Sequence, residues 1–310
     1  MKHLRYNIVI TAITLSLLLL TSCEKKELCY DHTHMVEMNV EFVWDSSRNA
    51  SPHTMVAHFF RMDGSPYLRF EFTNPKGGKV RVEEGEYKIL FHNGEMETVD
   101  EKEGNYDDFY LECISQSLLA PMGRADDNAP RPEHARQQAI SSTPNALWGG
   151  YHEYLDINRG NKGLTLQLHP EEATKNYTIT IHEVENIADD ATYSAALTGM
   201  SYQFNLSKMA HCGEAATLPL GIERVDEHTL RASFKAFGHC PNGEVNHTFT
   251  FYTSRQAYFN FDITESMHKS SDPNNITVDI YGLKLPNEGS SMSPSIDGWD
   301  EIIEENIKME

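Results

Sequence analysis

Short segments in which apolar and polar residues alternate, separated by turn residues, constrain the fold of this chain more than any other feature. In residues 35–43 every second residue is apolar, and a period of two is typical of a strand with one buried face. Residues 67–72 repeat this pattern, and Asp63-Gly64 before them favours a hairpin turn after a strand at 54–61. The N-terminal part is therefore expected to form antiparallel strands.

Similar segments continue along the chain. We expect further strands at residues 79–82, 86–92, 109–115, 163–169, 177–182, 202–206, 217–220, 229–237, 245–254, 258–264 and 276–285. Short strands separated by regular turns are typical of antiparallel sandwiches or barrels, and the amphipathic helices that parallel βαβ units require are missing. We expect a short helix at residues 187–194. The chain is expected to be all-β.

The expected strands fall into two runs that divide near residues 150–160. We therefore expect two β domains, an N-terminal one at 35–150 and a C-terminal one at 151–285. Residues 23–34 precede the first run without any hydrophobic period and are expected to be a tether.

The N-terminal segment is typical of an export signal. Lys2 and Arg5 supply positive charge, residues 8–20 are mostly apolar, and small residues follow. The apolar run is shorter than the roughly 20 residues that a membrane-spanning helix needs. Leu20-Thr-Ser-Cys23 resembles the bacterial lipobox, in which the cysteine is acylated and becomes the first residue after cleavage. We expect residues 1–22 to be removed and Cys23 to carry the lipid; the alternative is an ordinary signal peptide.

The chain is acidic, with a formal net charge of −20. Removing residues 1–22, which hold Lys2 and Arg5 and no acidic residue, makes this charge −22. Nucleic-acid binding depends on cations that neutralise phosphates, so nucleic acid is not an expected partner. An acidic surface also repels anionic lipid headgroups, so membrane attachment would depend on the acyl chains.

Two segments do not follow the strand pattern. Residues 121–146 hold four prolines and few large apolar side chains, which predicts a mobile surface loop. The tail, residues 286–310, begins with Gly, Ser and Pro and ends with Trp299, Ile302, Ile303 and Ile307 at helical spacing. A terminal edge strand is the alternative for this tail. Trp299, Ile303 and Ile307 are its candidate partner contacts.

Cysteine and histidine residues leave two chemistries open. An exported chain can form disulfides, and among Cys29, Cys113, Cys212 and Cys240 we favour the pair Cys212–Cys240. The repeated His211-Cys212 and His239-Cys240 supply the residue types of a Cys₂His₂ zinc site, but they lack the usual ligand spacing. We therefore assign no metal and no cofactor.

The chain resembles the Bacteroidales fimbrial-anchor lipoproteins and related Bacteroides lipoproteins. The resemblance rests on the lipobox, Glu27-Leu-Cys-Tyr-Asp-His32, GKVRVEEGEYKILFHNGE at 78–95, LTLQLHP at 164–170, YTITIHEVENI at 177–187 and AALTGM at 195–200. It implies two tandem transthyretin-like antiparallel β-sandwich domains and a lipid-anchored outer-membrane protein. It further implies that this protein anchors or assembles fimbriae, with fimbrial subunit proteins as partners held by strand exchange.

Two other functions compete with this one. Exposed Trp148, Tyr151 and Tyr154 would suit a surface glycan-binding lipoprotein, because aromatic rings stack on sugar faces. A hydrolase would need a nucleophile motif, and Gly-x-Ser-x-Gly does not occur, while Ser266-x-x-Lys269 lacks its partner motifs. The sequence thus indicates a non-enzymatic protein with no catalytic residues.

Overall fold

A computed structural model describes residues 34–45, 50, 52–102, 104–125, 128–158, 160, 163–240, 245–286, 299–302 and 308–309. From Val36 onward the chain forms one compact unit. Strands dominate it, and its described helices are short: η1 (Tyr106–Asp108), η2 (Ala120–Met122), η3 (Glu133–Ala135) and α2 (Thr264–His268). None of these helices is long and apolar enough to cross a membrane.

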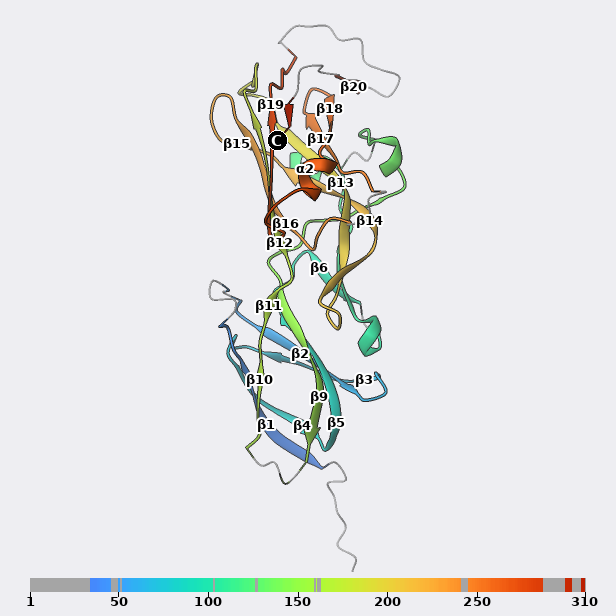
Figure 1. The fold of residues 1–310 in the computed structure, drawn as a ribbon, viewed down its shortest axis with the longest axis vertical. Helices are drawn as coiled ribbons and strands as arrows, with labels where there is room; N and C mark the ends of the chain where they lie inside the picture. The colour runs from blue at the N-terminus through green and yellow to red at the C-terminus, as the bar shows by residue number, and fades with distance from the viewer. Residues whose placement is uncertain are drawn as a thin grey trace, which may run out of the picture. The chain divides into compact units, whose positions relative to one another are not determined.

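The first sandwich pairs two sheets. The smaller sheet has the strand order β10 (Thr165–Leu168), β1 (Met35–Phe42), β4 (Gly77–Glu83). The larger sheet has the order β11 (Glu171–Glu172), β9 (Trp148–Ile157), β5 (Gly85–Asn93), β2 (Met55–Arg61), β3 (Pro66–Phe72). Apolar side chains from both sheets meet in one buried cluster that includes Met38, Phe59 and Phe91. These strands lie together in Figure 1, with β1 beside β10.

The second sandwich also pairs two sheets. One sheet has the order β15 (Glu223–Arg224), β16 (Leu230–Ala236), β12 (Lys175–His182), β19 (Asn275–Tyr281), β21 (Lys308–Met309). The other has the order β20 (Asp300–Glu301), β18 (Ala257–Asp262), β17 (Thr248–Thr253), β13 (Tyr193–Asn205), β14 (Ala210–Gly221), β8 (Ala139–Ile140). Strand β7 (Tyr110–Cys113) also pairs with β13, and β6 (Val99–Lys102) pairs with β7. The all-β sandwich class expected from the sequence is confirmed.

Some strands of these sheets have one buried and one exposed face, whereas others are buried on both faces. Strand β1 alternates buried and exposed residues from Val36 to Phe42, as its sequence predicts. All six residues of β17 are buried, because Phe249 and Phe251 face the sandwich core while Tyr252 packs on the opposite face. The sequence of β17, TFTFYT, alternates threonine with phenylalanine although its threonines are buried too, so alternation by itself does not show that a face is exposed.

Sheet membership does not follow the boundary expected at residue 150. Strands β9 and β10, which carry the chain to Leu168, pair with β5 and β1 of the first sandwich. Strands β6, β7 and β8, which come before residue 150, belong to the largest sheet of the second sandwich. Sequence order therefore alternates between the two sandwiches, which a search for consecutive strand runs does not detect.

The helix predicted at residues 187–194 is wrong. Described residues 186–192 have no regular structure apart from a turn, and β13 begins at Tyr193. The ring of Tyr193 stacks on Phe251 of the neighbouring strand, with 5.5 Å between the ring centroids. Pairing and packing against β17 thus override the local preference.

The mobile loop predicted at residues 121–146 is also wrong for the described part of that segment. Ala129 and Ala135 are buried, and β8 pairs in parallel with β14. The Tyr252 hydroxyl donates to the Pro130 carbonyl oxygen at 2.6 Å, and Arg131 donates to the Gln138 carbonyl oxygen at 2.8 Å. The Tyr252 bond and the pairing with β14 therefore dock a segment that has few large apolar side chains, and the Arg131 bond holds it together internally.

Candidate functional site

The C-terminal tail contributes an edge strand to each sheet of the second sandwich. Strand β20 pairs in parallel with β18, and β21 pairs antiparallel with β19. The helix favoured by the spacing of the tail is therefore wrong for residues 300–301, where the alternative of an edge strand is correct. Each tail strand has only two residues, and the amides of Asp300 and Ile302 donate to carbonyl oxygens of Gln256 and Tyr258 at 2.9 and 3.0 Å.

Trp299 packs the beginning of β20 against the second sandwich. Its side chain is 2% exposed and lies in a buried cluster with Tyr252, the two rings meeting edge to face at 5.6 Å. The other buried members of this cluster are Leu118, Leu119, Ala129 and Ala196. Trp299 was expected to contact a partner, but in this structure it packs against its own chain. Ile303 and Ile307 lie outside the described residues.

The residues of the expected lipid and disulfide chemistry are only partly described. Cys23 lies outside the described residues. Cys240 is half-buried and forms no disulfide with a described side chain, whereas the side chain of Cys212 on β14 is not among those described. The Cys212–Cys240 disulfide stays a prediction.

Three histidines gather at one end of the second sandwich. His247 is buried, its Nε2 lies 3.0 Å from the His268 Nε2, and the His239 ring stacks on that of His268 at 5.3 Å. Burial, followed by the charges of His247 and His268, lowers the pKa of His239 to about 4. Burial also lowers the pKa of His247.

These lowered pKa values predict a loss of stability in acid. As the pH falls below about 6.5, the unfolded chain binds protons at His239 and His247 that the folded chain does not yet bind, so folding becomes less favourable down to about pH 4. Because His239 is half exposed, we expect it to contribute only about 1 kcal/mol of this loss. Urea unfolding from pH 7.5 to 4.5 should show a smaller fall for His239→Gln than for the parent. His53→Gln, a change in an exposed side chain, is the control, and parallel curves for His239→Gln would contradict the prediction.

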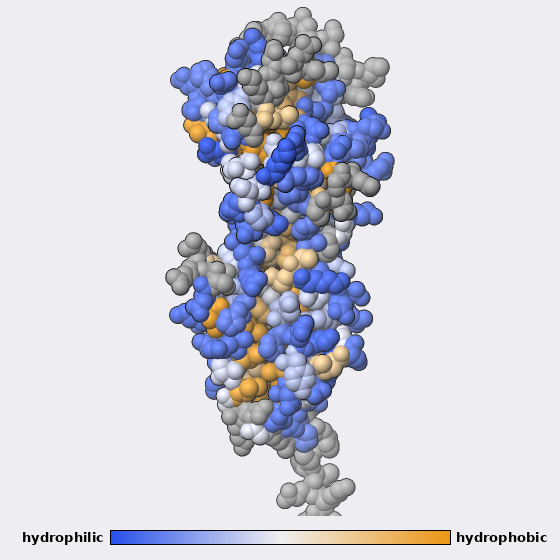
Figure 2. Space-filling model, in the orientation of Figure 1, coloured by the Kyte–Doolittle hydropathy of each residue, from blue (hydrophilic) through white to orange (hydrophobic). Residues whose placement is uncertain are grey.

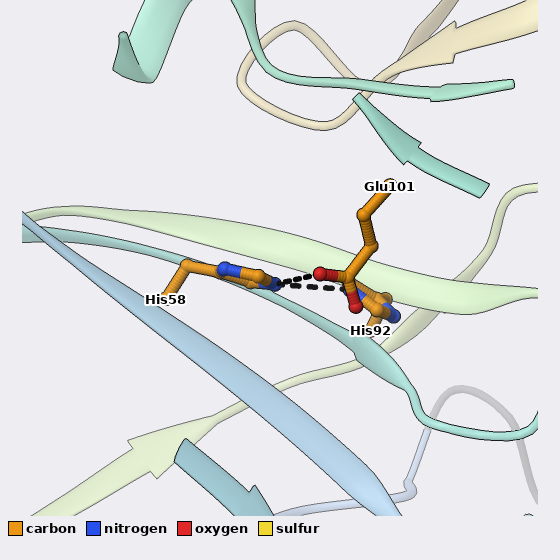
Figure 3. Close-up of side chains that lie close together, drawn as sticks. All are labelled: His58, His92 and Glu101. Carbon is orange, nitrogen blue, oxygen red and sulfur yellow. Dashed lines mark hydrogen bonds and ion pairs between the residues drawn. The ribbon is translucent and has the colours of Figure 1, made fainter. Parts of the chain in front are cut away.

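A second cluster joins strands of both sandwiches (Figure 3). His58 of β2 and His92 of β5 point toward one another, and Glu101 of β6 reaches them from the other sandwich. The His58 Nε2 lies 3.2 Å from the His92 Nε2 and 3.6 Å from the Glu101 Oε2. The His92 Nε2 lies 3.4 Å from the Glu101 Oε1. Among the described residues, these three form the one group of ligand-type side chains close enough to share a metal ion.

Burial and Arg69 define the electrostatics of this cluster. His58 and His92 are 6% and 0% exposed, and burial lowers the pKa of His58 to about 3. Arg69 donates to both Glu101 oxygens, at 2.8 Å from Nη2 to Oε1 and 2.9 Å from Nε to Oε2. Burial alone would raise the pKa of Glu101, but contacts with His92 and Arg69 outweigh it and lower that pKa.

A pocket of about 180 Å³ adjoins the cluster. It is lined by His58, Arg69, Tyr67, Leu68 and Phe109 among others. The Phe109 ring packs against His58, with 4.6 Å between the ring centroids. The pocket gives small solutes a route to His58.

Sequence reasoning did not single out His58, His92 or Glu101. Each histidine directly follows three apolar residues in its strand, in MVAHFFR and GEYKILFHN, which is the one signal available. Their convergence depends on the pairing of β2 with β5, and Glu101 joins them only because β6 crosses from the other sandwich.

The three aromatic residues considered for glycan stacking do not form one open row. Trp148 is half-buried against Trp44, with the rings edge to face at 6.4 Å. Tyr151 and Tyr154 are 43% and 53% exposed, and the Tyr154 hydroxyl donates to Glu86. Hydrophilic side chains cover most of the face seen in Figure 2, with smaller apolar areas in its lower half.

Comparison with solved structures identifies proteins of similar fold. A candidate adhesin from Bacteroides ovatus superposes with a TM-score of 0.60 at 15% identity, over 91% of this chain and 97% of that chain. A candidate polysaccharide-binding protein of the DUF1812 family from Bacteroides thetaiotaomicron gives 0.52 at 10% identity, over 80% and 91%. The fimbrial anchor protein Mfa2 from Porphyromonas gingivalis gives 0.48 at 11% identity, over 80% and 90%. The chain thus has the paired β-sandwich fold of the two Bacteroides proteins.

The family follows from the sequence itself. The sequence model of the domain of unknown function DUF5119 matches residues 22–221, which is more than half of the chain. The chain belongs to the DUF5119 family. No curated protein matches it.

Proposed function

We propose that this protein is a lipid-anchored, non-enzymatic component of the bacterial outer membrane that anchors or assembles fimbriae. The resemblance of its motifs to fimbrial-anchor lipoproteins suggests this role. The fold it shares with a candidate Bacteroides adhesin is consistent with it. Its partners would be fimbrial subunit proteins, and Cys23 would hold it in the membrane.

The observation that carries this proposal is the pairing of the tail. Strands β20 and β21 cover the edges of β18 and β19 with two residues each. An exposed edge binds another strand through a row of unpaired backbone groups, at about 0.5–1.5 kcal/mol net for each hydrogen bond. A longer strand from a subunit would form more of these bonds than β20 or β21 does. Partner binding would then require the tail to leave the edge, whether the subunit replaces the tail or the tail pairs with the subunit.

Lipid attachment accounts for the membrane side of the proposal. Each acyl methylene buried in the bilayer contributes about 0.8 kcal/mol, so the several chains of a bacterial lipoprotein hold it stably. The net charge of −20 offers no electrostatic attraction to anionic lipids.

A reversible engineered disulfide between β18 and β20 tests the proposal. Ala257 and Asp300 are register partners, so Ala257→Cys with Asp300→Cys would hold β20 on β18 when oxidised. We expect the oxidised double variant to lose at least 90% of its capture of an identified fimbrial subunit, and dithiothreitol to restore capture. The measurement is co-purification from membranes of cells that produce both proteins.

Three controls make the result decisive. Each single cysteine variant should capture the subunit normally with and without reductant. Cys23→Ser should move the protein from the membrane fraction to the soluble fraction and abolish labelling by a palmitate analogue. Full capture by the oxidised double variant would exclude exchange at the β18 edge, and unchanged labelling of Cys23→Ser would exclude acylation at that residue.

A further inference from the structure

We propose that His58, His92 and Glu101 bind a divalent cation of the zinc type, and that this cation clamps β6 of the second sandwich to β2 and β5 of the first. Two imidazoles and one carboxylate are a donor set that zinc prefers. This inference is independent of fimbrial binding.

The ligand-type atoms of this cluster are spaced like the ligands of a small cation. Zinc bonds of about 2.0–2.2 Å place tetrahedral ligand atoms roughly 3.3–3.5 Å apart. In this cluster 3.2 Å separates the His58 Nε2 from the His92 Nε2, 3.4 Å separates the His92 Nε2 from the Glu101 Oε1, and 3.6 Å separates the His58 Nε2 from the Glu101 Oε2. Each imidazole thus faces a different oxygen of the carboxylate, and one ligand atom from each side chain lies within 4.8 Å of the other two. A small cation would therefore reach all three side chains with little movement.

Hydrogen bonding alone leaves this cluster short of donors. The His92 Nδ1 lies 2.8 Å from the Asn93 carbonyl oxygen, which only accepts, so this nitrogen carries a hydrogen. The contact between the His92 Nε2 and the Glu101 carboxylate, 3.4 Å apart, is then attractive only if Nε2 also holds a positive centre, either a proton or a metal cation, since an imidazole without one would present a lone pair to the carboxylate. The His58 Nε2 supplies at most one hydrogen for both neighbours. A positive centre between the three side chains resolves this repulsion.

The surroundings resemble a prepared metal site. The bond from the His92 Nδ1 to the Asn93 carbonyl fixes the ring so that Nε2 faces the centre. Arg69 orients the Glu101 carboxylate through two hydrogen bonds. The adjoining pocket reaches His58, so water can supply the fourth ligand.

The alternative to a metal cation is a proton that converts His92 to imidazolium. The experiment distinguishes the cation from the proton.

The test is zinc binding to the mature chain after treatment with a chelator. Titration calorimetry and metal analysis should find one tightly bound Zn²⁺ that survives mutation of the other histidine cluster in His247→Gln with His268→Gln. Zinc at 100 times its Kd should raise the Tm by about 5 °C and slow amide exchange in β6 and β2. His53→Gln, which changes an exposed histidine, should behave as the parent.

Two substitutions at one position separate a cation from a proton. Glu101→Gln and Glu101→His both remove the ion pair with Arg69, but only histidine can ligate zinc. We expect Glu101→Gln to weaken zinc binding at least 100-fold and Glu101→His to restore most of it, with circular dichroism confirming that both fold. Absence of tight zinc binding in the parent would overturn the proposal in favour of the proton. Equal affinity in the parent and Glu101→Gln would overturn it in favour of another site.

Discussion

Replacing Gly77 with alanine is expected to destabilise the first sandwich by about 3–5 kcal/mol, the largest effect of any single methyl group that we anticipate. Gly77 begins β4 with φ of +96°, where a residue with a Cβ atom costs roughly 1–2 kcal/mol. An added Cβ would lie only 2.1 Å from the Val40 carbonyl oxygen. That oxygen belongs to β1, the central strand of its sheet, so the backbone cannot retreat without breaking strand pairing.

The neighbouring residue provides a matched control. An added Cβ at Gly78 would lie 3.7 Å from the Phe72 ring, an ordinary contact. Gly78→Ala should therefore change the free energy of unfolding by less than about 0.5 kcal/mol. Gly77→Ala should lower the Tm by roughly 8–15 °C in thermal unfolding. Equal Tm values for the two variants would show that the turn between β3 and β4 can adopt another conformation.

Replacing Trp299 with alanine is expected to release the tail. Removing a buried tryptophan side chain costs about 3–5 kcal/mol, and Trp299 is 2% exposed against Tyr252 and its neighbours. The two described backbone bonds from Asp300 and Ile302 contribute only about 0.5–1.5 kcal/mol each, so they cannot hold β20 alone. We expect the amides of these two residues to exchange at least 100 times faster in the Trp299→Ala variant.

Met309→Ala is the control for this change, because Met309 lies in the same tail and is 40% exposed. It should leave the exchange of both amides unchanged. If fimbrial capture depends on an open β18 edge, Trp299→Ala should also capture more subunit than Met309→Ala does. Protected Asp300 and Ile302 amides in the Trp299→Ala variant would mean that β20 is held by something other than this ring.

The strands that sequence predicts and the strands that it misses differ in their packing. The alternation in residues 35–43 identifies β1 because one face of β1 is buried and the other exposed. Strand β9 is not among the strands expected from the sequence, and its Gly149 and Gly150 have no side chain to contribute to an alternating pattern. These glycines serve packing instead, since a Cβ atom on Gly150 would lie 2.6 Å from the Phe91 ring.

Composition also predicts the wrong structure for a segment whose contacts are made by its backbone. Residues 121–146 have the prolines and polar residues of a mobile loop, yet the Tyr252 hydroxyl and the Arg131 guanidinium bond to their carbonyl oxygens. Tyr252 is 122 residues away from Pro130. Composition counts the side chains of a segment and carries no information about a donor so distant in sequence.

Local patterns in the sequence alone determined the all-β class, most strands of both sandwiches and the expected acylation at Cys23, because these depend on neighbouring residues. Tertiary structure decided which sheet each strand joined, and so placed β9 and β10 with the first sandwich and β6 to β8 with the second. It also decided that the tail pairs as strands at residues 300–301 and 308–309, where its spacing favoured a helix. The cluster of His58, His92 and Glu101 arises in the same way, since pairing between distant strands brings together side chains that the sequence separates by 43 residues.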